Sequence, residues 1–164
     1  MTFRAGILTL SDKGSKGERE DKSGKLIEKK LHELDIQVEE YRILPDEEQE
    51  IIKVMCYLSD EKKLDLILTT GGTGLSPRDF TPEATLKIIE KEVPGIAEAM
   101  RYESIKKTPH GMLSRGVSGV RGRTLIINMP GSPKAVEECM DVIMPAIPHA
   151  LQTLSGQASE CARE

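Results

Sequence analysis

The sequence is poor in aromatic residues, in cysteine and in long apolar runs. It has no tryptophan, three tyrosines and two phenylalanines, so no aromatic platform for stacking several bases is visible. Its three cysteines lie far apart without a Cys-x-x-Cys pair, which indicates a reducing compartment. No apolar run could span a bilayer, and the start of the chain lacks the long apolar core of a secretory signal. We therefore expect a cytoplasmic protein without membrane contact.

An excess of charge of one sign is missing as well. The formal net charge is −4 with acidic and basic residues interspersed, which argues against a nonspecific binder of nucleic acid or membrane surfaces. A small phosphorylated ligand stays compatible with this charge, because a local basic pocket does not show in the sum. The length of 164 residues fits one domain with an aliphatic core. We expect this domain over residues 1–156, followed by a polar tail over residues 157–164.

Apolar periodicity predicts that strands and helices alternate, which favours a parallel sheet with helices on both faces. Strands are expected at Phe3–Leu10, Ile36–Leu44 and Leu66–Leu68, followed by helices that end near Leu34, Asp60 and Lys91. The charged loop Ser11–Ser23 is expected to be flexible when empty and to fold over a ligand, and Asp21 or Ser23 caps the helix that follows it. Later elements are a helix between Pro94-Gly95 and Pro109-His110-Gly111, a hairpin of Val117–Val120 with Thr124–Met129, and a last helix that Pro145 and Pro148 kink or divide.

The stretch Asp65–Glu83 combines a short buried strand, a glycine loop and a helix start. Three glycines between positions 71 and 74 permit positive φ and let several backbone N–H groups converge on an anion. Thr81, Pro82 and Glu83 are typical of a helix N-cap, first position and acidic first turn. This order places phosphate-binding amides at the carboxyl edge of a sheet. The pattern is neither a P-loop nor a dinucleotide fingerprint, so spacing alone leaves a plain tight turn as the alternative.

Other polar residues also follow expected strands. Asp12 and Asp46 come after the first two, and the turn Asn128–Pro133 follows the last one with a serine that can cap a helix. Ligands bind at this edge in open parallel sheets. Two simpler interpretations stay open. Asp46 could only cap a helix, and the arginines at 78, 115 and 121 could be solvated surface charges.

These motifs together resemble a known family. Thr70–Ala84, Pro94-Gly95, Leu113–Arg115 and Leu125–Pro133 are similar, in this order, to the MogA/MoaB family of molybdenum cofactor biosynthesis and to the G domains of plant Cnx proteins and gephyrin. The resemblance runs from about Gly6 to Leu154. It implies a three-layer α/β/α domain with a mostly parallel central sheet and a small β-hairpin. It also implies a homotrimer and a transient contact with the molybdate-insertion enzyme.

The activity implied by the resemblance is that of a molybdopterin adenylyltransferase, which moves AMP from ATP to the terminal phosphate of molybdopterin and releases pyrophosphate. Asp46 and Asp79 match the family's two catalytic aspartates, and carboxylates suit the Mg²⁺ that the reaction uses. Phe80, where relatives often have valine, leaves this assignment intact. The other matching residues are expected to bind molybdopterin or ATP: Ser11, Asp12, Asp21, Gly71, Gly72, Thr73, Gly74, Arg78, Thr81, Pro82, Glu83, Ser114, Arg115, Asn128, Pro130, Gly131, Ser132 and Pro133.

Within this set, the amides of Gly71 to Gly74 would cradle one phosphate and the guanidinium of Arg115 or Arg78 would clamp another. Because both substrates are polyanions, positioning and charge neutralisation should dominate catalysis. One alternative is a noncatalytic molybdopterin-binding or scaffold trimer of the MoaB type, since fold does not fix activity. Another is a related nucleotide or molybdate-insertion enzyme, because the same domain is similar to part of the larger MoeA and CinA proteins. Those proteins, however, carry further domains. Retention of both aspartates favours the transferase.

Overall fold

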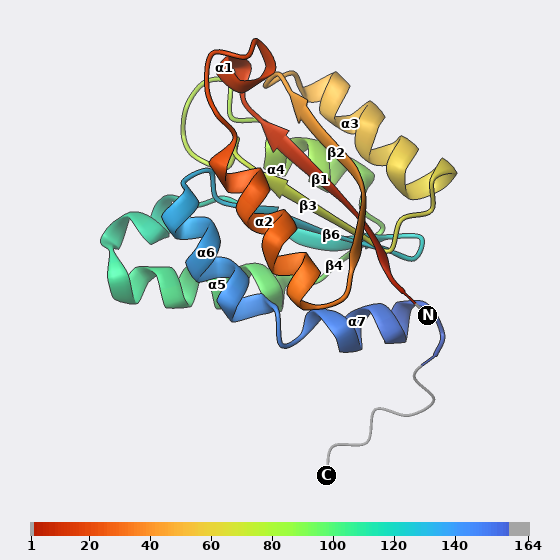
Figure 1. Ribbon diagram of the computed structural model, residues 1–164. Helices are drawn as coiled ribbons and strands as arrows, with labels where there is room; N and C mark the ends of the chain where they lie inside the picture. Colours follow the sequence, from red (N-terminus) through yellow and green to blue (C-terminus); the bar gives the residue numbers. More distant parts are fainter. Residues whose placement is uncertain (1, 158–164) are drawn as a thin grey trace.

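The computed structural model describes residues 2–157, which form one six-stranded sheet with helices on both faces (Figure 1). The strands are β1 Arg4–Leu10, β2 Gln37–Leu44, β3 Leu66–Thr70, β4 Lys91–Glu92, β5 Ser118–Arg121 and β6 Thr124–Met129. The α-helices are α1 Asp12–Ser15, α2 Lys22–Glu33, α3 Glu48–Cys56, α4 Thr81–Ile88, α5 Pro94–Lys107, α6 Pro133–Ile143 and α7 Ile147–Leu154. A π-helix, η1 Tyr57–Glu61, continues α3, and a 3-10 helix, η2 Pro109–Leu113, follows α5.

The sheet has the strand order β2-β1-β3-β6-β5-β4. The first four strands of this order run parallel, with Ile7 opposite Leu68 and Leu68 opposite Ile127. β5 and β6 form an antiparallel hairpin, and β4 pairs antiparallel with β5 at the edge. The expected sheet, mostly parallel with a small hairpin, is thus confirmed.

Alternating side chains divide the interior into two cores. Along β1, Ala5 and Ile7 pack with α2, α5, α6 and α7, whereas Leu8 and Leu10 pack with α3, η1 and α4. β3 and β6 are buried over their whole length, as expected for central parallel strands covered on both faces. Figure 1 shows the two helical layers on opposite sides of the sheet. The three-layer α/β/α architecture is therefore confirmed.

The structure differs from the expected elements at a few boundaries. α4 ends at Ile88 instead of Lys91, because Lys91–Glu92 pairs with β5 as the edge strand β4. The loop expected after β1 contains the short helix α1, whose N-cap Ser11 accepts a hydrogen bond from the N–H of Gly14 (3.0 Å). The last helix is divided around Pro145, as expected. Residues 158–164 of the expected tail lie outside the described residues.

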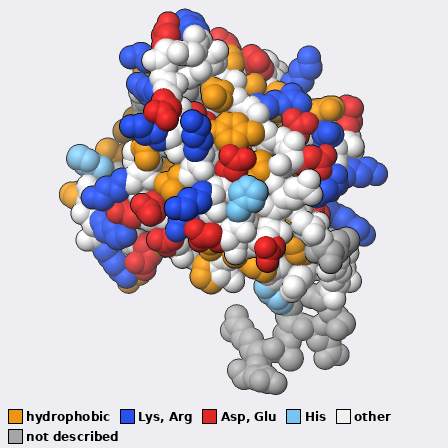
Figure 2. Space-filling model, viewed as in Figure 1, with side chains coloured by type: hydrophobic (Ala, Val, Ile, Leu, Met, Phe, Trp, Pro, Cys, Tyr) orange, Lys and Arg blue, Asp and Glu red, His pale blue; other side chains and the backbone are white. Residues whose placement is uncertain are grey.

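The four parallel strands end at one edge of the sheet, where their connections to the following helices gather. On the face shown in Figure 2, acidic and basic side chains are interspersed, in line with the mixed charge of the sequence. No helix among the described residues is long and apolar enough to cross a membrane. The polar loops at the strand ends are therefore the place to search for a site.

Candidate functional site

A cavity of about 830 Å³ lies at the carboxyl ends of the parallel strands. It is lined by segments that follow four different strands, which is the arrangement expected for a ligand site in an open parallel sheet. The lining residues are Thr9, Leu10, Ser11, Gly14, Arg19, Glu20, Asp21, Lys22, Ser23, Asp46, Thr70, Gly71, Gly72, Asp79, Gly131, Ser132 and Pro133. We call it the strand-end cavity.

The loop after β3 can form only because two of its residues are glycine. Gly71 and Gly72 have φ of +96° and +69°, in the left-handed region that other residues rarely adopt. A Cβ at Gly71 would lie 2.4 Å from the carbonyl oxygen of Leu10, and one at Gly72 would lie 2.2 Å from Oγ1 of Thr81. Bare backbone therefore faces the strand-end cavity, and Thr73 and Gly74 line a neighbouring groove instead.

Asp46 is held at the end of β2 by an exchange of hydrogen bonds with Asp12. The N–H of Asp12 donates to Oδ2 of Asp46 (3.0 Å), and the N–H of Asp46 donates to Oδ1 of Asp12 (3.0 Å). The interpretation of Asp46 as a helix cap is wrong, because Glu47 is the N-cap residue of α3 and no side chain caps that helix. Burial, reinforced by the charges of Asp12 and Asp79, raises the pKa of Asp46 above its ordinary value.

Asp79 approaches the same cavity from the loop between β3 and α4. Its Oδ2 accepts a hydrogen bond from the N–H of Ser76 (2.9 Å), which fixes the carboxylate on its own turn. Since the charge of Asp79 contributes to the raised pKa of Asp46, the two carboxylates act on each other across the cavity. The structure thus brings together the two residues that were expected to be catalytic.

Arg78 is turned toward carboxylates of neighbouring loops. Its Nε and Nη2 donate to the two carboxylate oxygens of Asp12 (2.7 and 3.0 Å), and Nη2 also donates to Oε1 of Glu47 (3.0 Å). The guanidinium, through this bidentate bond, holds the pKa of Asp12 below its ordinary value. Arg78 therefore connects the loops after β1, β2 and β3, and it is not among the residues that line the cavity.

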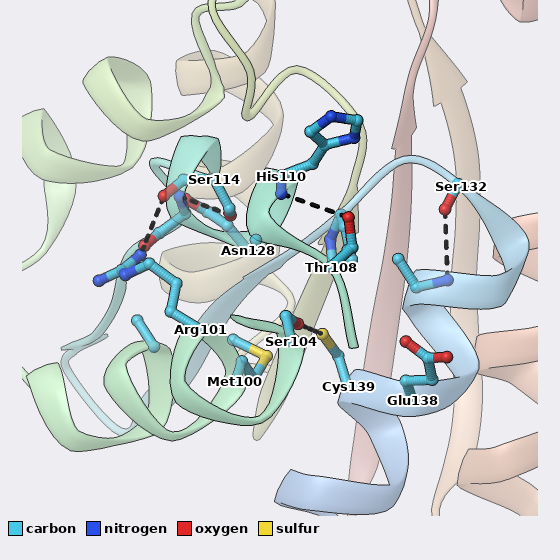
Figure 3. Close-up of a pocket in the computed structure, with 15 residues that line it drawn as sticks. Met100, Arg101, Ser104, Thr108, His110, Ser114, Asn128, Ser132, Glu138 and Cys139 are labelled. Atoms are coloured by element: carbon cyan, nitrogen blue, oxygen red, sulfur yellow. Dashed lines mark hydrogen bonds between the residues drawn. The ribbon is translucent and has the colours of Figure 1, made fainter. Parts of the chain in front are cut away.

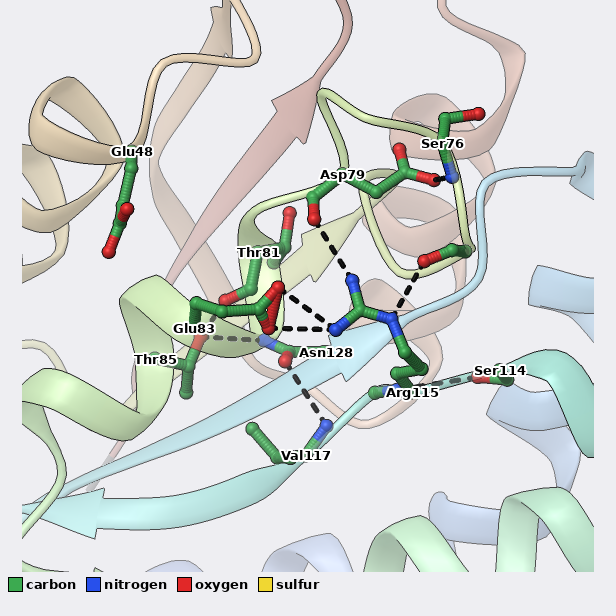
Figure 4. Close-up of polar contacts among 12 residues, drawn as sticks. Glu48, Ser76, Asp79, Thr81, Glu83, Thr85, Ser114, Arg115, Val117 and Asn128 are labelled. Carbon is green, nitrogen blue, oxygen red and sulfur yellow. Dashed lines mark hydrogen bonds and ion pairs between the residues drawn. The ribbon is translucent and has the colours of Figure 1, made fainter.

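Arg115 lies next to the loop that carries Asp79, and its guanidinium is also held by hydrogen bonds (Figure 4). Its Nη1 donates to both carboxylate oxygens of Glu83 (2.9 and 2.8 Å), at the first turn of α4. Its Nε donates to the carbonyl of Gly74 (2.8 Å) and its Nη2 to the carbonyl of Asp79 (2.9 Å). Arg115 is half-buried and holds both ends of the 74–79 loop, so it is not a solvated surface charge. Arg78 is exposed at the surface within its ion pairs, and Arg121 pairs with Asp60.

Asp21, which caps α2, is surrounded by protein donors. The N–H of Gly24 donates to Oδ1 (2.9 Å), while Oδ2 accepts from Oγ1 of Thr9 (2.6 Å) and from the hydroxyl of Tyr41. Burial raises the pKa of the Tyr41 hydroxyl, and its hydrogen bond to Asp21 raises this pKa further. Sequence reasoning missed Thr9 and Tyr41, since a strand threonine and a strand tyrosine carry no spacing signal.

Besides Thr73, three predicted ligand residues are buried. Thr81 is fully buried and donates from Oγ1 to the carbonyl of Gly71 (2.9 Å). The amide of Asn128 donates to Thr69 and Thr85, and its Oδ1 accepts from the N–H of Val117. Pro82 is buried beside them in α4. These three residues shape the loops at the strand ends and do not line the strand-end cavity.

A second cavity, of about 290 Å³, lies between α5, η2 and α6 (Figure 3). Ala97, Met100 and Cys139 give it an apolar floor, and Ser132 belongs to both cavities. The predicted residues Ser114, Asn128 and Pro130 line it, together with residues that sequence reasoning missed: Arg101, Ser104, Thr108 and His110. No motif or spacing marks these four residues, which lie on α5, η2 and the junction between them and become a cavity wall only when α6 packs opposite.

Within residues 2–157 no group of three or more His, Cys, Asp or Glu side chains has the arrangement of a metal site. The pair Asp46 and Asp79 nevertheless fits Mg²⁺, which proteins commonly hold through one or two carboxylates while substrate phosphates and water complete its shell. Burial is the main cause of the raised pKa of Asp46, and the charges of Asp12 and Asp79 add to it, so a cation bound here would favour the ionised carboxylate.

The fold and site define an α/β domain with a polar cavity at the carboxyl edge of its parallel strands, where open parallel sheets bind ligands. The family model of the probable molybdopterin binding domain matches residues 6–149. The chain belongs to this MogA/MoaB family, as its sequence motifs indicated.

Similar proteins cover nearly the whole chain. A molybdopterin adenylyltransferase of Helicobacter pylori (strain J99) is 45% identical over 95% of this chain and 90% of its own length. A molybdopterin adenylyltransferase of Escherichia coli (strain K12) is 38% identical over 99% of this chain and 91% of its own. The crystal structure of the molybdopterin biosynthesis enzyme MoaB from Thermus thermophilus has a TM-score of 0.90 and 51% identity, covering 97% of this chain and 100% of that one.

Proposed function

We propose that this protein is a molybdopterin adenylyltransferase, which transfers AMP from ATP to the terminal phosphate of molybdopterin. The observation that carries the proposal is the meeting of Asp46, Asp79 and the bare backbone of Gly71-Gly72 in one cavity. Relatives that are 38% and 45% identical over nearly the whole chain bear this name, which supports the same reaction here.

The reaction exchanges one phosphoanhydride bond for another. An oxygen of the molybdopterin phosphate attacks the α-phosphorus of ATP, a new P–O–P link forms, and the bond from the α-phosphorus to the β-phosphate oxygen breaks so that pyrophosphate leaves with the electron pair. No strong base is needed, because the attacking oxygen is already ionised. The protein must hold two polyanions together, so orientation and charge neutralisation supply most of the rate enhancement.

The two aspartates are held in place by different parts of the chain. Asp46 is partly buried and fixed by Asp12, whereas Asp79 is fixed on its own turn by Ser76. Together they would hold Mg²⁺, which when bound supplies the positive charge that polyphosphate binding requires. The N–H of Gly72 would orient a phosphate between them, whereas the N–H of Gly71 donates to the carbonyl of Met129 (3.4 Å).

The adjoining cavities suit the two parts of molybdopterin. The strand-end cavity is large and polar, as a phosphate site requires, and the smaller cavity has an apolar floor at Met100 and Cys139 with hydroxyl and amide groups around it. A fused ring system needs such a mixture of apolar contact and directed hydrogen bonds. We place the pterin in the smaller cavity, and its phosphate passes Ser132 into the larger one.

The experiment is a turnover assay with purified protein, molybdopterin, Mg²⁺ and α-labelled ATP, followed for pyrophosphate and adenylylated pterin. Asp46→Asn and Asp79→Asn should each lower kcat at least a hundredfold, while pterin binding stays within about threefold of wild type. Asp60→Asn is the matched control, because this carboxylate pairs with Arg121 far from the cavity and should leave kcat unchanged. Tight pterin binding without pyrophosphate release would show a carrier or scaffold instead. Sedimentation equilibrium tests the homotrimer that we also propose.

A further inference from the structure

Both arginines that the sequence offers as phosphate clamps are already held by carboxylates. Arg78 pairs with Asp12 and Glu47, and Arg115 pairs with Glu83. Either guanidinium would have to break charge-assisted hydrogen bonds before it could bind a phosphate. The polyanionic substrates of the proposed reaction therefore call for another source of positive charge.

Two other cations line the strand-end cavity. Arg19 and Lys22 both belong to its wall, and within residues 2–157 neither side chain has an ion-pair or hydrogen-bond partner. Their neighbour Lys25 differs on both counts, since it pairs with Glu20 (3.6 Å) and does not line the cavity. Arg19 and Lys22 are thus the uncommitted cations of this site.

None of the acidic residues of the cavity forms an ion pair with Arg19 or Lys22. Glu20 pairs with Lys25, and the carboxylate of Asp21 is occupied by Thr9, Tyr41 and the N–H of Gly24. Asp46 and Asp79 lie on the loops after β2 and β3, and the proposed Mg²⁺ would neutralise them. What remains is a pair of free cations on the segment before and at the start of α2.

The start of α2, to which Lys22 belongs, is well fixed although the side chains of Arg19 and Lys22 are exposed. Asp21 caps α2 directly between them, and the hydroxyl of Ser23 donates to the carbonyl of Gly131 (2.7 Å) in the turn before α6. Ser132 in that turn caps α6 through a bond from the N–H of Ala135 (3.2 Å). Lys22 therefore starts from a fixed edge of the cavity, and Arg19 lies two residues before the cap Asp21, so ordering their side chains is a main cost of binding.

We propose that Arg19 and Lys22 bind the polyphosphate of the nucleoside triphosphate, on the part that leaves as pyrophosphate. The proposal rests on the function proposed above. The leaving pyrophosphate gains negative charge as its bond to the α-phosphorus breaks, and cations that contact it stabilise that change. Two cations on one wall of the cavity suit a group with several charges better than the single phosphate monoester of the pterin.

The direct test is calorimetric binding of inorganic tripolyphosphate to the full chain. Arg19→Ala and Lys22→Ala should each weaken binding about tenfold, as expected for the loss of one charge-assisted contact. The single variants Arg19→Lys and Lys22→Arg keep the positive charge, and their affinity for tripolyphosphate should stay within about threefold of wild type. Lys29→Ala removes an exposed cation of α2 that does not line the cavity, and it should change the affinity less than twofold.

Catalysis gives a second measurement. In the turnover assay the two alanine variants should raise the KM for ATP about tenfold and leave the KM for molybdopterin unchanged. Unchanged tripolyphosphate affinity in both variants, or an equal loss in Lys29→Ala, would overturn the proposal. So would a loss confined to glycerol phosphate, a phosphate monoester, because the cations would then serve the pterin phosphate. A wild-type chain that binds tripolyphosphate through these cations but never releases pyrophosphate would refute the proposed function alone.

Discussion

Asp12 and Asp46 each accept a hydrogen bond from the other's backbone N–H, both at 3.0 Å, and so join the ends of β1 and β2. This exchange uses Oδ2 of Asp46, whereas a Cβ added at Gly72 would lie 3.5 Å from its Oδ1. Oδ1 therefore faces the glycine loop. The proposed catalytic carboxylate is positioned by a residue 34 positions away in the sequence, and Arg78 holds that residue in turn.

The first prediction concerns Asp12 as a positioning residue. Asp12→Ala removes the acceptor for the N–H of Asp46 and the partner of Arg78, and we expect kcat to fall about tenfold. Asp12→Asn keeps one side-chain oxygen that can accept from Asp46 and should lose no more than about threefold. Steady-state kinetics compare the two, with thermal unfolding as the measure of structural damage. Equal losses would show that the charge of Asp12, and not its hydrogen bond, is what matters.

The second prediction is a dependence on pH. Burial raises the pKa of Asp46, so the folded protein binds a proton there at a pH at which the unfolded chain has lost it. Protonated Asp46 therefore contributes to the free energy of unfolding at low pH, and this contribution is lost as the pH rises through the raised pKa of the folded state. Asp46→Asn should therefore increase the melting temperature at pH 7, by about 1–3 °C, and the increase should vanish in acid. Wild-type turnover should fall on the acid side as Asp46 takes up its proton.

The third prediction assigns Arg115 the task of positioning Asp79. Its guanidinium reaches Glu83 and the carbonyls of Gly74 and Asp79, a set of bonds that the ammonium of lysine cannot reproduce. Arg115→Lys should lower kcat about tenfold or more, with both KM values within about twofold. Glu83→Gln keeps an acceptor and should lose less. A rise in the KM for ATP without a fall in kcat would instead make Arg115 the phosphate clamp that the sequence indicated.

The sequence predicted the fold well because its signals are local. Buried runs such as Leu66–Leu68, the proline after Ser132 and the division at Pro145 each determine a structure within a few residues. β4 escaped prediction because two exposed residues become a strand only through pairing with β5.

The site was predictable only in part. Asp46, Asp79 and the glycine loop follow strands, so parallel topology alone brings them to one edge. The partners of Arg78 and Arg115 could not be predicted, since these ion pairs join residues 31 to 66 positions apart and depend on side-chain directions. The smaller cavity was missed for the same reason, because α5, η2 and α6 meet only in the folded chain.

The last prediction tests the glycine loop itself. Gly72→Ala must place a side chain at φ +69° and within 2.2 Å of Oγ1 of Thr81, so we expect the free energy of unfolding to fall by about 2–4 kcal/mol. Gly95→Ala is the matched control, because no atom lies within 4 Å of its added Cβ and its φ is not left-handed, so stability should stay equal or rise by about 0.5–1 kcal/mol. Combining Gly72→Ala with Thr81→Ala removes the Oγ1 contact but not the backbone strain, and should recover only part of the loss. Urea unfolding measures all three. A Gly72→Ala protein as stable as wild type would mean that the loop adopts another conformation in solution, and with it the cavity would lose its bare backbone wall.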